Sequence, residues 1–138
     1  MAYFPDLSPY AYGSYSHPGV VHIGWLDNIH PFPKGKVSDH LLEKMRKLAK
    51  KPTELYRGVH VCELCCTPAG LYPAPKDWTD EHRLAWWEWS KPRSSNGEIR
   101  ITAGSVTFAA PVLITHYIKE HGYLPPPEFL KALEEAPS

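Results

Sequence analysis

Apolar residues follow two kinds of spacing along the chain, and each predicts a different kind of element. Residues 20–26 are apolar and β-branched, which predicts a strand, and residues 53–62 are predicted to form another. Residues 98–102 and 105–109 flank Ala103-Gly104 and predict a β-hairpin. The extended segments together therefore predict a small antiparallel sheet.

Four other segments carry apolar residues at helical spacing. The predicted helices cover residues 39–51, 80–89, 111–121 and 128–135. Ser38 is a suitable N-cap for the first helix, and Gly122 is a suitable residue to end the third. With the strands placed between these helices, the order of elements predicts an α+β fold with about four short helices.

The first predicted helix has a basic face, made of Lys44, Arg46, Lys47, Lys50 and Lys51. We interpret it as a solvated face, because cations near the C-terminus of a helix are favoured by the helix dipole. A patch for phosphate or for a partner is the alternative interpretation.

The composition indicates a folded protein without a general affinity for polyanions. The 138 residues suit one domain, predicted over 1–138, and an aromatic content of 12% argues against disorder. Fifteen acidic residues balance 15 basic ones, so no nucleic acid and no anionic membrane is expected as a partner. No apolar run could span a bilayer and no secretory signal is recognisable, so we predict a cytoplasmic location.

Residues 67–95 are rich in proline and tryptophan and resemble an insertion into the domain. On the helix predicted there, Trp86 and Trp89 share a face, and Trp87 points about 100° away. Three rings arranged in this way cannot all face one core. We therefore predict that Trp86, Trp87 and Trp89 bind a partner, with simple packing as the alternative.

Two pairs of potential metal ligands occur far apart in the sequence. Cys62 and Cys65 form a C-x2-C unit, and His116 and His121 form an H-x4-H unit on a predicted helix. The two spacings together match those of a Cys2His2 zinc site. Because four protein ligands complete the coordination shell of zinc, we predict a closed, structural site that stabilises the domain.

Other assignments of these residues remain open. His60 lies two positions before Cys62, on the same side of a strand, and could replace either helical histidine. Cys66 could replace Cys65, although C-x3-C spacing is less usual. The cysteines also fit a redox pair, or could be ordinary buried thiols.

A further pair with chemical potential is Glu98 and Arg100, which alternate on one face of a predicted strand. They could act as an acid and an anion clamp, or simply form a structural pair. The sequence contains no Gly-rich phosphate loop, no G-x-S-x-G and no H-E-x-x-H motif. Catalysis therefore has no recognised motif to support it.

Three motifs occur together along the chain: Gly58-x-His60-x-Cys62-x-x-Cys65, Asn96-Gly97-Glu98-Ile99-Arg100 and Ala110-Pro111-x-Leu113-Ile114-x-His116-Tyr117-x-x-x-His121-x-Tyr123-x-Pro125-Pro126. As a set they resemble a family of small bacterial proteins of unknown function. The similarity covers nearly the whole chain except residues 67–95. It implies a bacterial origin and a compact domain, and it implies no activity. Small proteins of this sort are often encoded beside toxins.

These observations predict a non-enzymatic protein-binding module with a structural zinc site. A cognate toxin is the first expected partner, which would make the chain an immunity protein. The alternative is a small metalloenzyme in which zinc binds a water molecule and Glu98 acts as general base.

Overall fold

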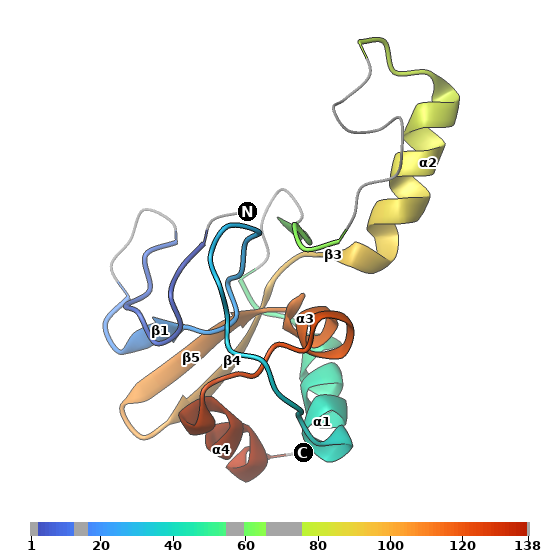
Figure 1. Ribbon diagram of the computed structural model, residues 1–138. Coiled ribbons are helices and arrows are strands. Elements are labelled where there is room, and N and C mark those ends of the chain that lie inside the picture. Colours follow the sequence, from blue (N-terminus) through green and yellow to red (C-terminus); the bar gives the residue numbers. More distant parts are fainter. Residues whose placement is uncertain (1–2, 13–16, 55–59, 66–75, 138) are drawn as a thin grey trace.

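The computed structural model describes residues 3–12, 17–54, 60–65 and 76–137 (Figure 1). Its helices are α1 (Asp39–Ala49), α2 (Asp80–Ser90), α3 (Ile114–His121) and α4 (Pro127–Glu135), with a 3-10 turn η1 (Lys91–Arg93) after α2. Its strands are β1 (Val20–His22), β2 (His60–Val61), β3 (Ser94–Ser95), β4 (Glu98–Ala103) and β5 (Val106–Pro111). The predicted α+β class is confirmed. None of the described helices has the length and apolar character needed to cross a membrane.

The principal sheet has three strands in the order β1-β5-β4. β4 and β5 form the predicted hairpin, in which Ile101 is opposite Phe108. β1 pairs in parallel with the other edge of β5, so the sheet is mixed rather than wholly antiparallel. A parallel pair needs a long crossover, and the chain passes through α1, β2, α2 and β4 before β5 pairs with β1. β2 and β3 form a separate antiparallel ladder.

Two strands are shorter than the sequence predicts. β1 ends at His22, and Gly24 beyond it has a φ of +71°, a conformation outside the extended range. Within the predicted strand 53–62, Thr53 forms an isolated bridge with Glu98, and β2 covers two residues. Residues 55–59 lie outside the described part of the chain.

The third helix begins later than predicted. Pro111 was expected at its first position, but Pro111 is the last residue of β5, opposite Glu98, and α3 starts at Ile114. The fixed φ of proline suits both the first turn of a helix and the end of a strand. Pairing with β4 decides between them here.

The basic face of α1 is also less uniform than predicted. Lys44 is buried, and its Nζ donates a hydrogen bond of 2.9 Å to the carbonyl oxygen of Glu134 in α4. This lysine therefore links two helices and is not part of a solvated face.

The two faces of the principal sheet pack against different parts of the chain, as the alternation of side chains along a strand requires. On one face, α1, α3 and α4 cover the main core, which includes Ile101 and Phe108 (Figure 1). Phe108 meets Phe129 of α4 with ring centroids 5.9 Å apart. On the other face, Ala109 packs against Trp25.

The N-terminal segment, residues 3–12, contributes to that second face. His22 of β1 is fully buried between the rings of Phe4 and Tyr10, at centroid distances of 3.8 and 4.7 Å. Trp25 is fully buried as well, and its Nε1 donates a hydrogen bond of 3.0 Å to a carbonyl oxygen of β5. The second face thus has an aromatic core of its own.

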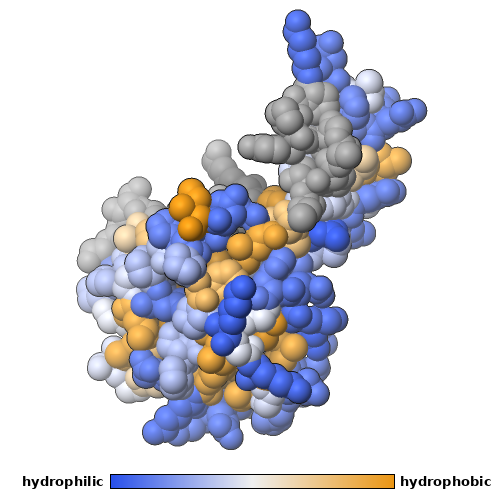
Figure 2. Space-filling view, viewed as in Figure 1, coloured by the Kyte–Doolittle hydropathy of each residue, from blue (hydrophilic) through white to orange (hydrophobic). Residues whose placement is uncertain are grey.

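Residues 76–93, which include α2 and η1, form an arm that projects from the body of the protein (Figure 1). A capping box between Thr79 and His82 begins the helix. No side chain of α2 is buried, and Leu84 and Trp87 are 55% and 58% exposed. Figure 2 shows hydrophobic residues exposed on the side of this arm.

Candidate metal centre

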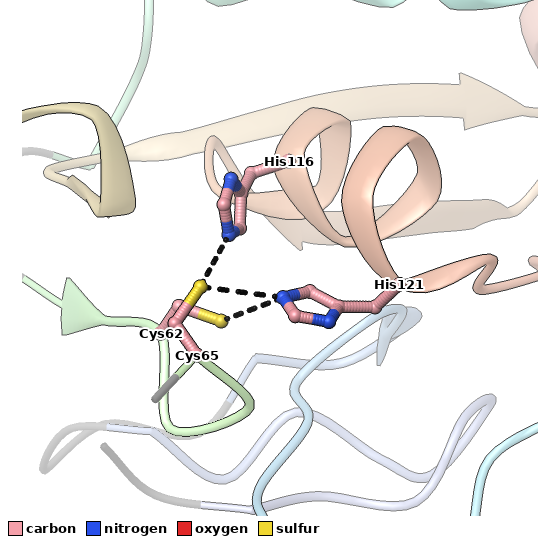
Figure 3. A group of neighbouring side chains, drawn as sticks. All are labelled: Cys62, Cys65, His116 and His121. Carbon is pink, nitrogen blue, oxygen red and sulfur yellow. Dashed lines mark hydrogen bonds between the residues drawn. The ribbon is translucent and has the colours of Figure 1, made fainter. Parts of the chain in front are cut away.

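Four potential metal ligands from two distant segments converge in the structure (Figure 3). Cys62 and Cys65 lie in the turn after β2, and His116 and His121 lie on α3. Their ligand atoms are all within 4.8 Å of one another, so the group could hold a metal ion. The structure therefore brings together the four residues that the sequence spacing singled out.

The sulfur and nitrogen atoms lie at distances that suit a shared ion. Cys65 Sγ is 3.2 Å from His116 Nε2 and 3.4 Å from His121 Nε2. Cys62 Sγ is 3.4 Å from His121 Nε2. In a tetrahedral zinc site, Zn–S bonds of about 2.3 Å and Zn–N bonds of about 2.0 Å place sulfur and nitrogen about 3.5 Å apart. The observed donor set therefore fits a tetrahedral ion.

Local backbone contacts position both halves of the group. The Cys62 amide donates a hydrogen bond of 2.8 Å to the carbonyl oxygen of Arg93, which fastens the cysteine turn to the end of η1. On the other side, His121 is the last residue of α3, and Gly122 follows it with a φ of +68°. Glycine adopts this left-handed conformation without steric cost, so the helix ends at the second imidazole.

Burial shifts the protonation of these ligands. Desolvation lowers the pKa of His121, and desolvation together with the nearby His121 lowers the pKa of His116. Desolvation also raises the pKa of Cys62 to about 11. Neutral imidazoles can bind a metal directly, whereas a thiol must first lose its proton. Metal binding should therefore release protons and weaken as the pH falls.

The alternative ligands, His60 and Cys66, lie next to Cys62 and Cys65 in the sequence. His60 lies in β2, paired with Ser95, but its side chain and the whole of Cys66 lie outside the described part. The four described residues already match the usual coordination number of zinc. Two imidazoles beside both thiols also favour a metal over a redox pair, because a C-x2-C redox pair requires no such imidazoles.

One side of the metal group opens into a cleft of about 690 Å³. Cys65, His116 and His121 lie in the wall of this cleft, whereas Cys62 is buried behind them. The wall also carries three basic residues, of which the sequence marked Arg46 as part of a basic helix face but did not mark Arg93 and Lys119. The spacing of the three residues in the sequence does not indicate that they share a wall, because they come from three different elements.

Comparison with known proteins assigns the chain to a family. The model of a domain of unknown function, DUF7919, matches residues 2–134. The chain belongs to this family. The match confirms the expectation, drawn from the motifs, of an uncharacterised family that covers nearly the whole chain. No match was found among curated proteins or among solved structures.

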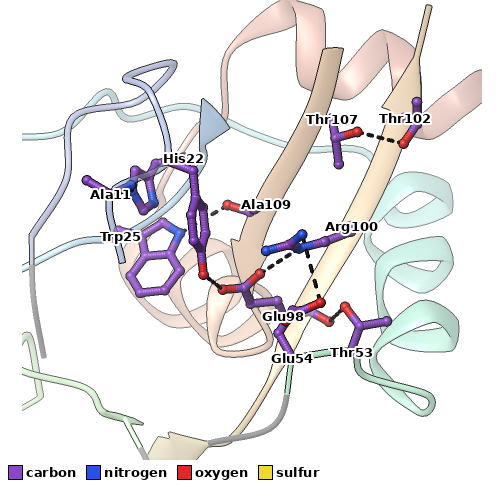
Figure 4. A network of polar contacts seen from close by, with 11 residues as sticks. Ala11, His22, Trp25, Thr53, Glu54, Glu98, Arg100, Thr102, Thr107 and Ala109 are labelled. Carbon is purple, nitrogen blue, oxygen red and sulfur yellow. Dashed lines mark hydrogen bonds and ion pairs between the residues drawn. The ribbon is translucent and has the colours of Figure 1, made fainter. Parts of the chain in front are cut away.

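In this DUF7919 chain, Glu98 and Arg100 form an ion pair on the second face of the sheet, with Glu98 buried and the Arg100 side chain 20% exposed (Figure 4). Arg100 Nε donates a hydrogen bond of 2.8 Å to Glu98 Oε1, and the Tyr10 hydroxyl donates to Glu98 Oε2. Glu98 is fully buried and does not line the cleft beside the metal group. A general base must reach the proton that it removes, so this geometry supports a structural role for Glu98.

The tryptophans of α2 are arranged as helical geometry predicts. The rings of Trp86 and Trp89 lie 5.2 Å apart, and Trp78 meets Trp86 edge-on at 6.3 Å. Trp87 points elsewhere and is 58% exposed, with Lys91 Nζ 4.8 Å from its ring centroid. The packing interpretation therefore suits Trp86 and Trp89, whereas Trp87 leaves much of its ring in solvent.

Proposed function

We propose that this DUF7919 chain is a non-enzymatic protein-binding module in which a structural zinc ion holds the scaffold. Zinc is the ion that this donor set favours, because two thiolates and two imidazoles in a tetrahedral arrangement are typical of structural zinc. With four protein ligands, no coordination position is left for a water molecule or a substrate. The zinc supplies folding free energy in this proposal, and no chemical step depends on it.

The observation that carries the proposal is the exposed surface of the α2 arm. Trp87 and Leu84 are each more than half exposed, at 58% and 55%, and no residue of α2 is buried. Large apolar side chains gathered on a projecting element are typical of surfaces that a partner covers. Tryptophan is also enriched among residues that dominate binding energy.

A bacterial toxin is the partner that we propose, with the chain acting as its immunity protein in the cytoplasm. The support is indirect: the motifs resemble a family of small bacterial proteins of a sort often encoded beside toxins. A small module without net charge is compatible with a specific protein partner, since it has no general attraction for polyanions.

Co-expression tests this function directly. Cells that produce a toxin encoded beside this gene should survive with the wild-type chain and die with Trp87→Ala, while the thermal melt of the variant stays near that of the wild type. Truncation of a central interface tryptophan typically costs at least about 2 kcal/mol of binding. Lys131→Ala, on the exposed side of α4, is the matched surface control and should protect fully.

Two results would contradict the proposal. Full protection by a well-folded Trp87→Ala variant would remove the arm from the interface. Concentration-dependent dimerisation that this substitution abolishes would instead place a second copy of the chain on the arm.

A further inference from the structure

The cleft beside the metal group lies where the arm joins the body. Residues of α1, η1 and α3 form its walls together with the cysteine turn. Its volume of about 690 Å³ is in the range of sites that enclose a small ligand or a short peptide segment.

The charge of this wall is positive, although the whole chain is neutral. Arg46, Arg93 and Lys119 contribute three positive charges, and Glu120 contributes the one negative side chain among the lining residues. A zinc ion bound by two thiolates and two neutral imidazoles adds no net charge. Because the whole chain has 15 residues of each sign, this excess is a local feature of the lining. Arg46 also lies 3.7 Å from the exposed carboxylate of Glu43, which is not among the lining residues.

Arg93 connects the cleft to Trp89 of α2. Its Nη1 donates a hydrogen bond of 2.8 Å to the carbonyl oxygen of Trp89, and its guanidinium lies 5.5 Å from the Trp89 ring centroid. Its own carbonyl oxygen accepts the hydrogen bond from the Cys62 amide. The guanidinium is thus held at the root of the arm, between the metal group and the aromatic surface of α2.

We propose that this cleft binds the carboxylates of an acidic segment of the protein partner that covers the arm. The inference rests on the proposed function and names the chemistry of the partner. Arginine and lysine form strong, charge-assisted hydrogen bonds with carboxylates. A partner segment that crosses the root of the arm places its acidic residues in the cleft.

The arm itself disfavours a nucleic acid as the occupant. Beyond the cleft, α2 carries the acidic residues Asp80, Glu81 and Glu88 and a single arginine, Arg83, which pairs with Asp80, so the net charge of this helix would repel a phosphate backbone laid along it. A protein segment can instead carry acidic residues opposite the basic cleft and neutral residues opposite α2.

The test uses the metal-loaded full chain and a fluorescent hexaglutamate peptide, with hexaglutamine as the neutral probe. Fluorescence anisotropy should show hexaglutamate binding that weakens with added salt, and no binding of hexaglutamine. The double substitution Arg46→Gln and Lys119→Gln should weaken hexaglutamate binding at least about tenfold, because two charge-assisted contacts are lost. Lys131→Gln removes an exposed charge of α4 outside the cleft and should leave the affinity unchanged.

The outcomes separate this inference from the proposed function. Trp87→Ala should leave hexaglutamate affinity unchanged, because the peptide has no apolar side chain to cover the ring. Equal hexaglutamate binding by wild type and double variant would overturn the inference, and so would stronger binding of a single-stranded oligonucleotide or of inorganic phosphate. If the double variant still protects cells while Trp87→Ala does not, the inference fails and the proposed function stands. If hexaglutamate binds as expected but Trp87→Ala protects fully, the proposed function fails.

Discussion

Two parts of this chain are rich in aromatic residues, and one of them is buried whereas the other is exposed to solvent. Around the N-terminal segment, Trp25 is 0% exposed, and backbone hydrogen bonds of 2.7 and 2.9 Å join Leu7 and Tyr10 to the carbonyl oxygens of β1. On the α2 arm, Trp87 is 58% exposed, and no residue of the helix is buried.

The difference shows that aromatic density does not by itself decide between core and surface. The N-terminal rings reach a face of the sheet that the helices leave open, and each ring can bury about 150–250 Å² there. The rings of α2 have no such face and pack partly on one another. The predictions below are ordered by the size of the effect expected in each region.

The metal centre should give the largest effect, because it joins the root of the arm to the body. We expect about one zinc ion per chain, and we expect Cys62→Ser or Cys65→Ser to lose it. Structural zinc contributes on the order of 10 kcal/mol to the folding of small zinc domains, so both variants should be strongly destabilised. Elemental analysis of untagged protein and thermal melts measure the two effects.

Cys66→Ser is the control for this experiment, because the substitution changes a neighbouring thiol that we do not assign as a ligand. Its melt should stay close to that of the wild type. Equal losses for Cys65→Ser and Cys66→Ser would mean that the wrong thiol was assigned, and well-folded protein without metal would contradict the centre itself.

Trp25→Ala should give the next largest effect. This ring is fully buried, and its Nε1 donates one of the two hydrogen bonds that the carbonyl oxygen of Ala109 accepts, so truncation leaves a cavity and removes a buried hydrogen bond. Truncation of a buried tryptophan typically costs about 3–5 kcal/mol. Urea unfolding measures the loss, and a change below about 1 kcal/mol would mean that the second face does not depend on this ring.

His22 should make the free energy of unfolding depend on pH, with an effect smaller than that of Trp25→Ala. Burial lowers its pKa from the ordinary 6.5 to about 4. Between these values the unfolded chain binds a proton that the folded chain does not, so stability falls as the pH drops from 6.5 towards 4. The full contribution is about 3 kcal/mol.

Urea titrations of wild type and His22→Gln across this pH range measure that contribution. Glutamine retains an acceptor for the Ala11 amide, which bonds to His22 Nε2 at 3.0 Å, but it does not titrate. Loss of metal at low pH affects both proteins, so the difference between them isolates the histidine. Identical slopes for the two proteins would show that His22 is not responsible.

Trp87→Ala should have the smallest effect on stability, within about 0.5 kcal/mol, because an exposed surface residue contributes little to the fold. The same urea assay used for Trp25→Ala measures it. A loss comparable to that of Trp25→Ala would abolish the contrast between the two regions and place the ring in a core.

The sequence predicted the features that have a local chemical signature. The C-x2-C and H-x4-H spacings identified the four residues that converge. Each pair is recognisable because its two members are close together in the sequence. Caps and turn residues likewise marked the helices and the hairpin.

Features that depend on distant partners were not predictable in this way. Nothing in residues 20–22 shows that β1 pairs in parallel with β5, because register and direction are set by the partner strand. Pro111 ends β5 and does not begin α3, because it pairs with Glu98 across the hairpin. The burial of His22 follows from two rings on another segment, Phe4 and Tyr10, and not from its own neighbours in sequence.

The contacts at the root of the arm have a consequence for how the length of the arm can change. β2 pairs with β3, and the Cys62 amide binds the carbonyl oxygen of Arg93, so the chain leaves the body and returns at one place. The ends of a loop closed in this way stay in position when its length changes, and each doubling of length costs only about 0.6 kcal/mol of closure entropy. The arm between these contacts can therefore change in length while its two ends keep their places on the body.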